Sequence, residues 1–220
     1  MMCNLYDIGP APARQARGWR GKIIEVLKTA PKTYAIRKTD PGIVLRSDPE
    51  TGETEPEIMR WGFHRDFNPA LNNARFDKLK HGMWSAAWQD GRRCVIPVAT
   101  FYEWSGPAGS KQTHAFLRTE GTDEPDWLWM AGLWEDDPEH GRRYTMITTD
   151  ARGQIAAIHD RMPVILVTDD VEGFLSAPPS ADPEILIDSG KLITELATFR
   201  CLNPMKSPKP GSPVQDQWLF

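Results

Sequence analysis

The sequence predicts an α+β fold: a single domain with a mostly antiparallel, barrel-like β-sheet core and flanking helices. Apolar, β-branched runs follow one another in the second half, without the regular strand–helix alternation that a doubly wound parallel sheet requires. At 220 residues the chain is long enough for one well-packed domain, and no repeat, low-complexity tract or linker divides it. We expect the domain to span residues 2–200, followed by an irregular, proline-rich tail at 203–220.

Helical and extended patterns mix in the first ninety residues. Residues 12–29 place Trp19, Ile23, Ile24 and Leu27 near helical spacing, so they predict a helix that Pro31 ends. A second helix is predicted at 77–90 and is closed by Gly91. Short strands are expected at 33–36, 42–47 and 56–63, the first two around a turn-like TDPG at 39–42.

Extended patterns dominate from residue 92 onward. The run at 92–104 is apolar and β-branched and predicts a strand. Further strands are expected at 113–118, 127–134, 143–149 and 163–167. Residues 155–160 predict a helical turn or loop, and 168–177 and 183–192 predict helices.

Bulk properties indicate a cytoplasmic globular protein. No apolar stretch approaches membrane-spanning length, and the N-terminus lacks the apolar core of a secretory signal. Three scattered cysteines form no C-x-x-C pair, so we expect no disulfide framework, no metal and no cofactor. The net charge of −4 does not indicate nucleic-acid binding, although basic residues gather between Arg60 and Lys80. A basic run of this kind is more often a solvated face than a binding site.

Cys3 is the first residue with distinctive chemistry. Once Met1 and Met2 are removed, it carries a free α-amine beside its thiol. These groups have ordinary pKa values of about 8 and about 8.5, so useful fractions of free amine and thiolate exist near neutrality. Such a 1,2-aminothiol condenses with an aldehyde to a Schiff base and then a five-membered thiazolidine. An internal cysteine cannot do this, because its nitrogen is already an amide.

Three other segments carry candidate site residues, each with an ordinary structural alternative. Glu103 ends an apolar run, where a carboxylate is either exposed or an acid whose pKa apolar neighbours raise. His159 lies in a loop-like stretch that offers little burial. Asn73 could donate through its amide and Arg75 could hold a phosphate with its fork, although Asn72-Asn73 is also typical of a turn.

Six ordered motifs together resemble the SRAP (SOS response-associated peptidase) family, whose members include abasic site processing proteins. They span residues 2 to about 167: Met2-Cys3-Asn4-Leu5-Tyr6, Arg60-Trp61-Gly62, Asn73-Ala74-Arg75, Arg93-Cys94-Val95-Ile96-Pro97, Phe101-Tyr102-Glu103-Trp104 and Ile158-His159-Asp160-Arg161-Met162-Pro163.

The resemblance implies a specific set of roles. Cys3 corresponds to the crosslinking N-terminal cysteine, Asn73 to an orienting asparagine, Glu103 to the acid–base carboxylate and His159 to a proton-handling histidine. The implied DNA-binding residues are Arg75, Trp61, Thr148, Arg60 and Arg161, with packing as the alternative for Trp61.

The sequence also departs from the family pattern. The family start is Met-Cys, whereas this chain begins Met1-Met2-Cys3, and Met2 hinders ordinary exposure of Cys3. Asn4-Leu5 replaces a Gly-Arg pair, so the phosphate contact of that arginine must come from elsewhere. Asp77 stands where many members have glutamate.

The resemblance therefore implies a monomer that senses abasic sites in single-stranded DNA and protects them by a covalent thiazolidine crosslink. Removal of the initiating residue would be a peptidase-like, hydrolytic step, and a lyase-like activity is a further expectation. The expected location is the cytoplasm, with nucleoid association when DNA is bound. Two alternatives stay open: a thiol peptidase or amidase with Cys3 as nucleophile and His159 as base, and a non-catalytic single-strand binder that uses aromatic stacking.

Overall fold

The computed structural model describes residues 4–9, 17–29, 35–118, 127–188, 192 and 196–201. Cys3 and the expected tail at 203–220 lie outside these residues. The described strands are β1 (Leu5–Asp7), β2 (Ala35–Arg37), β3 (Pro41–Ser47), β4 (Thr54–Trp61), β5 (Phe63–Arg65), β6 (Asn68–Leu71), β7 (Asn73–Arg75), β8 (Arg93–Val98), β9 (Thr100–Ser105), β10 (Gln112–Arg118), β11 (Leu128–Asp137), β12 (Gly141–Asp150), β13 (Arg161–Pro163), β14 (Ile165–Leu166) and β15 (Leu196–Cys201). The described α-helices are α1 (Gly18–Thr29), α2 (Ser85–Gln89), α3 (Val171–Ser176) and α4 (Pro183–Leu186).

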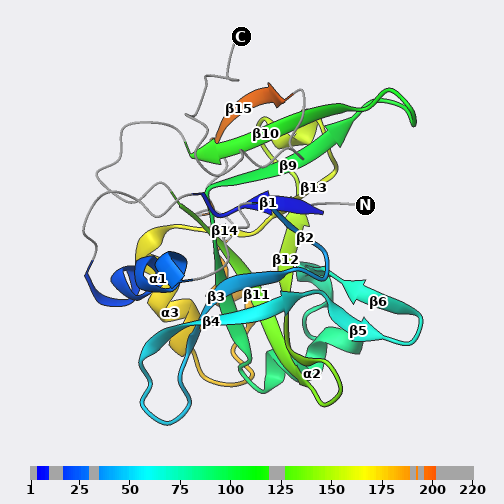
Figure 1. Cartoon of the computed structure of the whole chain (residues 1–220). Coiled ribbons are helices and arrows are strands. Elements are labelled where there is room, and N and C mark those ends of the chain that lie inside the picture. Colours follow the sequence, from blue (N-terminus) through cyan, green and yellow to red (C-terminus); the bar gives the residue numbers. More distant parts are fainter. Residues whose placement is uncertain are drawn as a thin grey trace.

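Five strands close into a small barrel at the centre of the molecule (Figure 1). The circuit of paired strands runs β12–β4–β3–β8–β11 and returns to β12. The pairing of β12 with β4 is parallel and the other four pairings are antiparallel. Closure leaves the barrel strands without an open edge, which protects them from pairing with other chains.

The barrel interior is narrow where β11 passes β8 and β12. Gly132 lies opposite Cys94 on one side and Met146 on the other. A Cβ atom on Gly132 would lie 2.7 Å from the Thr145 carbonyl oxygen and 2.9 Å from the Cys94 sulfur. Only glycine therefore fits at this position without displacing a neighbouring strand. Cys94 is fully buried, and burial raises its pKa well above the ordinary value.

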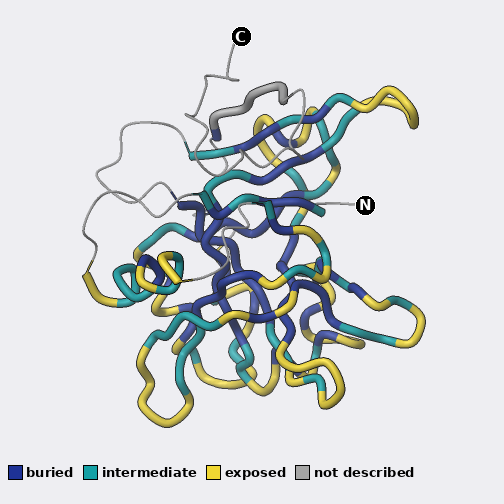
Figure 2. The backbone as a smooth tube through the Cα atoms, in the orientation of Figure 1, coloured by how far each residue is buried: buried dark blue, intermediate teal, exposed yellow. Residues whose placement is uncertain are grey.

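A second sheet lies along one side of the barrel, in the order β15-β10-β9-β1-β2, with antiparallel pairing throughout. The run predicted as one strand at 92–104 connects the two sheets, since β8 belongs to the barrel and β9 to the second sheet. The chain changes sheet at Ala99, whose N–H donates to the Asp7 carbonyl at 2.8 Å. Figure 2 shows that the strands of both sheets are buried along much of their length, whereas the hairpin tips are exposed.

Helices α1 and α3 pack against the outside of the barrel (Figure 1). Helix α1 buries Ile23 and Ile24, and its Trp19 ring meets Trp129 edge-on with centroids 5.0 Å apart. Helix α3 is held by Arg93, which is only 1% exposed. Arg93 Nε donates to the Phe174 carbonyl at 3.0 Å, and its Nη2 reaches the Pro178 carbonyl at 3.0 Å. These bonds satisfy carbonyl groups at the C-terminal end of α3, where the helix itself supplies no further N–H donors.

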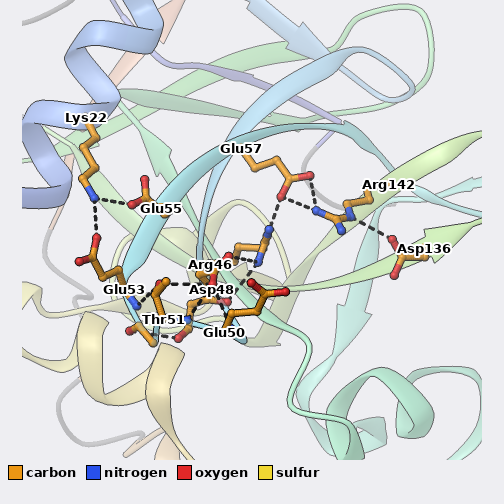
Figure 3. A network of polar contacts seen from close by, with 12 residues as sticks. Lys22, Arg46, Asp48, Glu50, Thr51, Glu53, Glu55, Glu57, Asp136 and Arg142 are labelled. Carbon is orange, nitrogen blue, oxygen red and sulfur yellow. Dashed lines mark hydrogen bonds and ion pairs between the residues drawn. The ribbon is translucent and has the colours of Figure 1, made fainter.

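Ion pairs on the outer surface join α1 to the β3–β4 hairpin, and they join that hairpin to the β11–β12 hairpin (Figure 3). Lys22 pairs with Glu53 and Glu55, and Glu57 accepts from both Arg46 and Arg142. Exposed pairs contribute little individually, but the Arg46 side chain is only 12% exposed, so its pairing with Glu57 is shielded from water.

Several local predictions are corrected by the structure. The helix predicted at 77–90 is wrong over its first half, because Gly82 adopts φ +65° and only α2 is α-helical there. The helix predicted at 183–192 is reduced to α4 within the described residues. The strand predicted at 56–63 breaks at Gly62, and the one at 163–167 divides into β13 and β14. Strands β1, β6, β7 and β15 were not expected.

The overall prediction of a single α+β domain with a mostly antiparallel, barrel-like core and flanking helices is confirmed. The helix predicted at 12–29 is confirmed from Gly18, and residues 10–16 lie outside the described part of the chain. Among the described residues no helix has the length and apolar character needed to cross a lipid bilayer.

Candidate functional site

A pocket of about 330 Å³ opens where β6, β7, β12 and the loop before β13 meet. Five of the residues predicted for the site line it: Asn73, Arg75, Thr148, His159 and Arg161. These positions are separated by as many as 88 residues in the chain (Asn73 to Arg161), so the fold is what brings them together.

Strand β7 places Asn73 and Arg75 in the pocket wall. It pairs in parallel with β12, and the register sets Asn73 opposite Met146 and Arg75 opposite Thr148. Because alternate residues of a strand share one face, Asn73 and Arg75 point the same way, while Ala74 between them is fully buried. Thr148 is 1% exposed, and its hydroxyl donates to the Ala74 carbonyl at 3.3 Å. The pairing of β7 with β12 therefore sets the spacing of these groups.

Trp61 supports the pocket from inside the protein. Its side chain is fully buried, its ring packs edge-on against Tyr6 with centroids 5.1 Å apart, and its Nε1 donates to the Asn72 carbonyl at 3.0 Å. Trp61 consequently offers no surface to a nucleic acid, which corrects its assignment as a DNA-binding residue in favour of packing. The following residue, Gly62, adopts φ +110°, and a Cβ atom on it would lie 3.0 Å from the Cα of Ala70 in the pocket lining.

The first described residue, Asn4, lies beside the pocket. Asn72, which lines the pocket, donates from its amide to Asn4 Oδ1 at 3.2 Å. Strand β1, which follows Asn4, pairs with β9 through Tyr6 and Phe101, and Glu103 lies two residues further along β9. The catalytic residue predicted before Asn4, Cys3, lies outside the described residues.

Glu103 is buried in β9 with only 1% of its surface exposed. Of the two alternatives left by the sequence, an exposed strand end is therefore excluded, and Glu103 is an interior carboxylate. It is not part of the pocket lining itself but lies on the strand next to β1. An interior carboxylate exchanges protons more readily with nearby buried groups than with bulk water.

His159 has a partner for either protonation state of its Nδ1 atom. The Arg161 backbone N–H lies 3.1 Å from Nδ1 and donates to it when that nitrogen carries no proton. Asp160 Oδ1 lies 2.8 Å from the same atom and accepts from it when it is protonated. An imidazole with both kinds of partner can gain or lose a proton with little rearrangement, which suits general acid–base chemistry.

Two arginines of the pocket are engaged by carboxylates. Arg75 is 59% exposed, and its fork holds both oxygens of Asp77 at 2.9 Å, which raises the pKa of Arg75 and lowers that of Asp77. Arg161 is only 14% exposed, pairs with Asp150, and donates to the Thr148 carbonyl at 2.7 Å. A phosphate would reach the Arg75 fork only by displacing Asp77.

The remaining basic stretch is largely paired within the protein. Arg65 forks onto Glu135 at 2.7 and 2.9 Å, and Lys80 lies 2.8 Å from Asp182. Arg60, predicted to bind DNA, is exposed on β4 outside the pocket lining and donates to the Thr39 carbonyl at 3.0 Å. That bond braces the turn that carries Lys38, a residue of the pocket wall.

With this geometry in place, comparison with known families becomes informative. The model of the family described as SOS response associated peptidase (SRAP) matches residues 2–198. The chain belongs to the SRAP family.

Curated SRAP relatives include proteins from animals and bacteria. The chain is 31% identical over 154 residues to "Abasic site processing protein HMCES" of Xenopus tropicalis, a match that covers 57% of this chain and 46% of the relative. It is 30% identical over 162 residues to "Abasic site processing protein YoqW" of Bacillus subtilis, covering 71% of this chain and 70% of the relative. The chain thus spans about half the length of the Xenopus relative and most of the bacterial one.

Solved structures support the fold. A protein from Bordetella bronchiseptica superposes with a TM-score of 0.64 at 21% identity, over 89% of this chain and 99% of the other. A protein from Bacteroides thetaiotaomicron gives a TM-score of 0.65 at 18% identity, over 91% and 93% of the two chains. At this level of identity the likeness concerns the SRAP fold alone.

Sequence reasoning missed part of the SRAP pocket lining. Lys38, Asn68 and Asp160 all contribute to the wall. Lys38 stands in a polar turn and Asn68 in a short hairpin, and neither has a spacing that sets it apart from surface residues. Asp160 lies within the recognised His159 motif, so its position beside the imidazole could have been noted as a second titratable group.

Proposed function

We propose that this SRAP protein captures abasic sites in single-stranded DNA by forming a covalent thiazolidine at Cys3. The observation that carries the proposal is the meeting of Asn73, Thr148 and His159 in one pocket beside Asn4. Asn4 follows Cys3 directly in the chain, and the proposal therefore places the reaction at this pocket. Relatives named abasic site processing proteins support an abasic site as the target.

The proposed reaction begins with opening of the abasic sugar to its aldehyde. The free Cys3 amine adds to the aldehyde carbon and gives a carbinolamine, which loses one water and becomes a Schiff base. The thiolate then adds to the imine carbon while the nitrogen takes a proton, which closes the thiazolidine ring. Overall, one aldehyde and one aminothiol give one thiazolidine and one water, with no metal or redox cofactor in the balance.

Glu103 and His159 supply the proton transfers in this scheme. Ring opening needs a base at the sugar hydroxyl and an acid at the ring oxygen, and His159 in the pocket wall has partners for both of its protonation states. Loss of water from the carbinolamine needs an acid near the Cys3 nitrogen. Glu103 is a buried carboxylate on β9, the strand that pairs with β1, and we assign this role to it. Asn73 orients the opened sugar through its amide.

Phosphate contacts in this proposal position the strand without selecting a sequence. Lys38 and Arg75 lie in the pocket wall, and Arg161 faces the pocket from a more buried position. Recognition therefore depends on the lesion and on a single strand that can bend into a concave site, rather than on base identity.

Exposure of the Cys3 amine requires removal of Met1 and Met2. We propose a hydrolytic, peptidase-like step in which water cleaves the bond after Met2, releasing a carboxylate on Met2 and the amine on Cys3. Intact mass spectrometry of the purified protein tests this step directly. A monomeric, cytoplasmic protein that associates with the nucleoid on binding DNA completes the proposal, and size-exclusion chromatography tests the monomer.

The decisive experiment mixes the protein with a single-stranded oligonucleotide that contains one abasic site, followed by a denaturing gel. We expect a shifted band that survives denaturation for the wild-type chain and for Glu57→Gln, a control glutamate that pairs with Arg46 and Arg142 away from the pocket. Cys3→Ser should abolish the band. Glu103→Gln should slow its formation by about 10²–10⁴-fold, the usual contribution of general acid catalysis.

Other outcomes identify the alternatives. A complex that forms on a native gel and dissociates on denaturation indicates a single-strand binder without covalent chemistry. Persistence of the denatured band in Cys3→Ser contradicts the proposed nucleophile. Cleavage of an unrelated peptide that depends on Cys3 and His159 indicates a thiol peptidase.

A further inference from the structure

A second group of chemically active side chains lies outside the pocket, where the β11–β12 turn meets β5. It consists of His64, Asp137 and His140, here called the His–Asp cluster. One ligand atom from each of the three residues lies within 4.8 Å of the other two. The two imidazole rings are in contact, with centroids 4.3 Å apart.

The β11–β12 turn itself presents two members of the His–Asp cluster. Asp137 ends β11, and its Oδ1 accepts the backbone N–H groups of Glu139 and His140, each at 3.0 Å. Gly141 then adopts φ +75° and turns the chain back into β12. This turn places the His140 ring beside the Asp137 carboxylate, and His140 Nδ1 lies 3.1 Å from both carboxylate oxygens.

Neighbouring residues hold the carboxylate in place. Arg143 Nε lies 3.2 Å from Asp137 Oδ2, and the same guanidinium donates to the Gly62 carbonyl at 2.9 Å. Arg65, next to His64, is bound to Glu135, which offsets much of its positive charge beside the cluster. A carboxylate fixed by a second group on its far oxygen is the arrangement that orients metal ligands in proteins.

We propose that the His–Asp cluster binds a divalent transition-metal ion of the Zn²⁺ type through His64, Asp137 and His140, with water as the fourth ligand. Two imidazole nitrogens and one carboxylate oxygen suit Zn²⁺, Ni²⁺ and Cu²⁺, whereas Mg²⁺ and Ca²⁺ require oxygen ligands. With bonds of about 2.0–2.2 Å, tetrahedral ligand atoms lie roughly 3.4 Å apart. His140 Nδ1 lies 3.1 Å from both Asp137 oxygens, close to that spacing, and the ligand atoms of all three residues lie within 4.8 Å of one another.

The expectation of no metal rests on the absence of C-x-x-C pairs, and the His–Asp cluster contains no cysteine. His64 is separated from Asp137 by 73 positions (137 minus 64), so only the contact of β5 with the barrel strands unites the set. Bound metal would tie the β5–β6 hairpin to the β11–β12 turn. Since β6 carries Asn68 and Ala70 into the pocket wall, the ion would also stabilise one side of that wall.

The test uses the full chain without an affinity tag, titrated by isothermal calorimetry with Zn²⁺, Ni²⁺ and, for comparison, Mg²⁺. We expect one Zn²⁺ per chain and a Tm that rises by about 5 °C or more when free Zn²⁺ is a hundredfold above its Kd. Mg²⁺ should change neither quantity. His64→Ala and His140→Ala should each weaken Zn²⁺ binding at least tenfold.

Two control variants distinguish the cluster from other ligands of the chain. His81→Ala removes an exposed histidine elsewhere, and Cys3→Ser removes the aminothiol, which is itself a strong zinc ligand. Both controls should bind Zn²⁺ at the cluster as the wild-type chain does. Unchanged affinity in His64→Ala and His140→Ala overturns the proposal, as does loss of binding in Cys3→Ser alone or no binding by the wild-type chain.

Discussion

At the scale of single residues, the Arg75–Asp77 pair lies where the proposed function requires a phosphate contact. Both side chains are about half exposed or more, and the fork of Arg75 is filled by Asp77. An exposed pair of this kind exchanges readily for another anion, because solvent weakens its attraction. The pair therefore keeps an arginine extended and positioned until DNA arrives.

Asp77→Asn should strengthen binding of single-stranded DNA about two- to fivefold, because the guanidinium no longer competes for an internal carboxylate. Fluorescence anisotropy with a labelled oligonucleotide measures the change, in a Cys3→Ser background that isolates non-covalent binding. Asp136→Asn is the matched control, since it also removes one negative charge beside an arginine, Arg142, but away from the pocket. Equal gains in the two variants would mean that net charge, and not the release of Arg75, is responsible.

Asp7 is the described residue whose titration most affects stability near neutrality. Burial raises the pKa of Asp7 to about 6, although the Gly9 N–H at 2.6 Å acts in the opposite direction. Between the ordinary value of 3.8 and about 6, the folded state binds the proton more tightly than the unfolded state does. Stability is therefore lost as the pH rises through this window, and the full cost is present above it.

Asp7→Asn should raise the free energy of unfolding by about 1–3 kcal/mol at pH 7.5 and by much less at pH 4.5. The amide oxygen can still accept from Gly9, so the turn is kept. Urea unfolding at the two pH values gives the comparison. A stability gain that is the same at both would show that Asp7 is not the titrating group.

At the scale of secondary-structure elements, the barrel depends on the close approach of β8, β11 and β12 at Gly132. A methyl group there would press on the Thr145 carbonyl and the Cys94 sulfur. In a closed barrel the backbone cannot move at one point without shifting a paired strand, so this crowding lowers the stability of the folded state.

Gly132→Ala should lower the free energy of unfolding by about 1–3 kcal/mol, the usual cost of overpacking a core. Gly173→Ala is the matched control, because a Cβ on Gly173 in α3 meets no atom within 4 Å. The free energy of unfolding of this control should rise by about 0.5–1 kcal/mol, because alanine reduces the conformational freedom of the unfolded chain. Thermal denaturation compares the two, and a stabilised Gly132→Ala would contradict the narrow barrel interior.

The sequence indicated strands well where the signal was local. The apolar runs at β8, β9 and β11 carry β-branched or aromatic residues and were recognised. Strand β7, Asn73-Ala74-Arg75, has no such composition and is extended because it pairs with β12, more than 70 residues later. The prediction of a helix at 77–90 is wrong because Gly82 adopts φ +65° within it, a conformation that an α-helix does not accommodate.

The candidate site was foreseen from its motifs more fully than from physical patterns. The motifs contain Asn73 and His159, and the family resemblance added Thr148 in the strand before the His159 loop; all three line one pocket. It could not show that Trp61 is buried, since an aromatic residue in a motif looks the same whether it packs or stacks. The sequence does not indicate Lys38, because its place in the pocket wall depends on the turn at Thr39, whose carbonyl accepts a hydrogen bond from Arg60.

At the scale of the whole molecule, charge is distributed so that the pocket attracts DNA only locally. The net charge is −4, and Arg65, Arg75 and Lys80 of the basic stretch are paired with carboxylates. These pairings reduce the positive charge that the basic stretch offers to a single strand.

Binding of single-stranded DNA by the Cys3→Ser variant should consequently depend only weakly on salt. With about two phosphates neutralised, by Lys38 and Arg75, the slope of log K against log salt should be roughly −1 to −2, from about −0.7 per phosphate. Anisotropy titrations at several KCl concentrations measure it. A much steeper slope would indicate a basic contact surface beyond the pocket.

Strand β12 pairs with β4, β7, β11 and β13, so it joins the barrel to both walls of the pocket. Its partners β4 and β7 are synthesised more than 60 residues before it, and their parallel pairing must wait until β12 leaves the ribosome. A nascent chain that has exposed its amino terminus therefore still lacks an assembled pocket. In the proposed function, the order of synthesis thus separates the time at which the terminus is accessible for trimming from the time at which a lesion can be engaged.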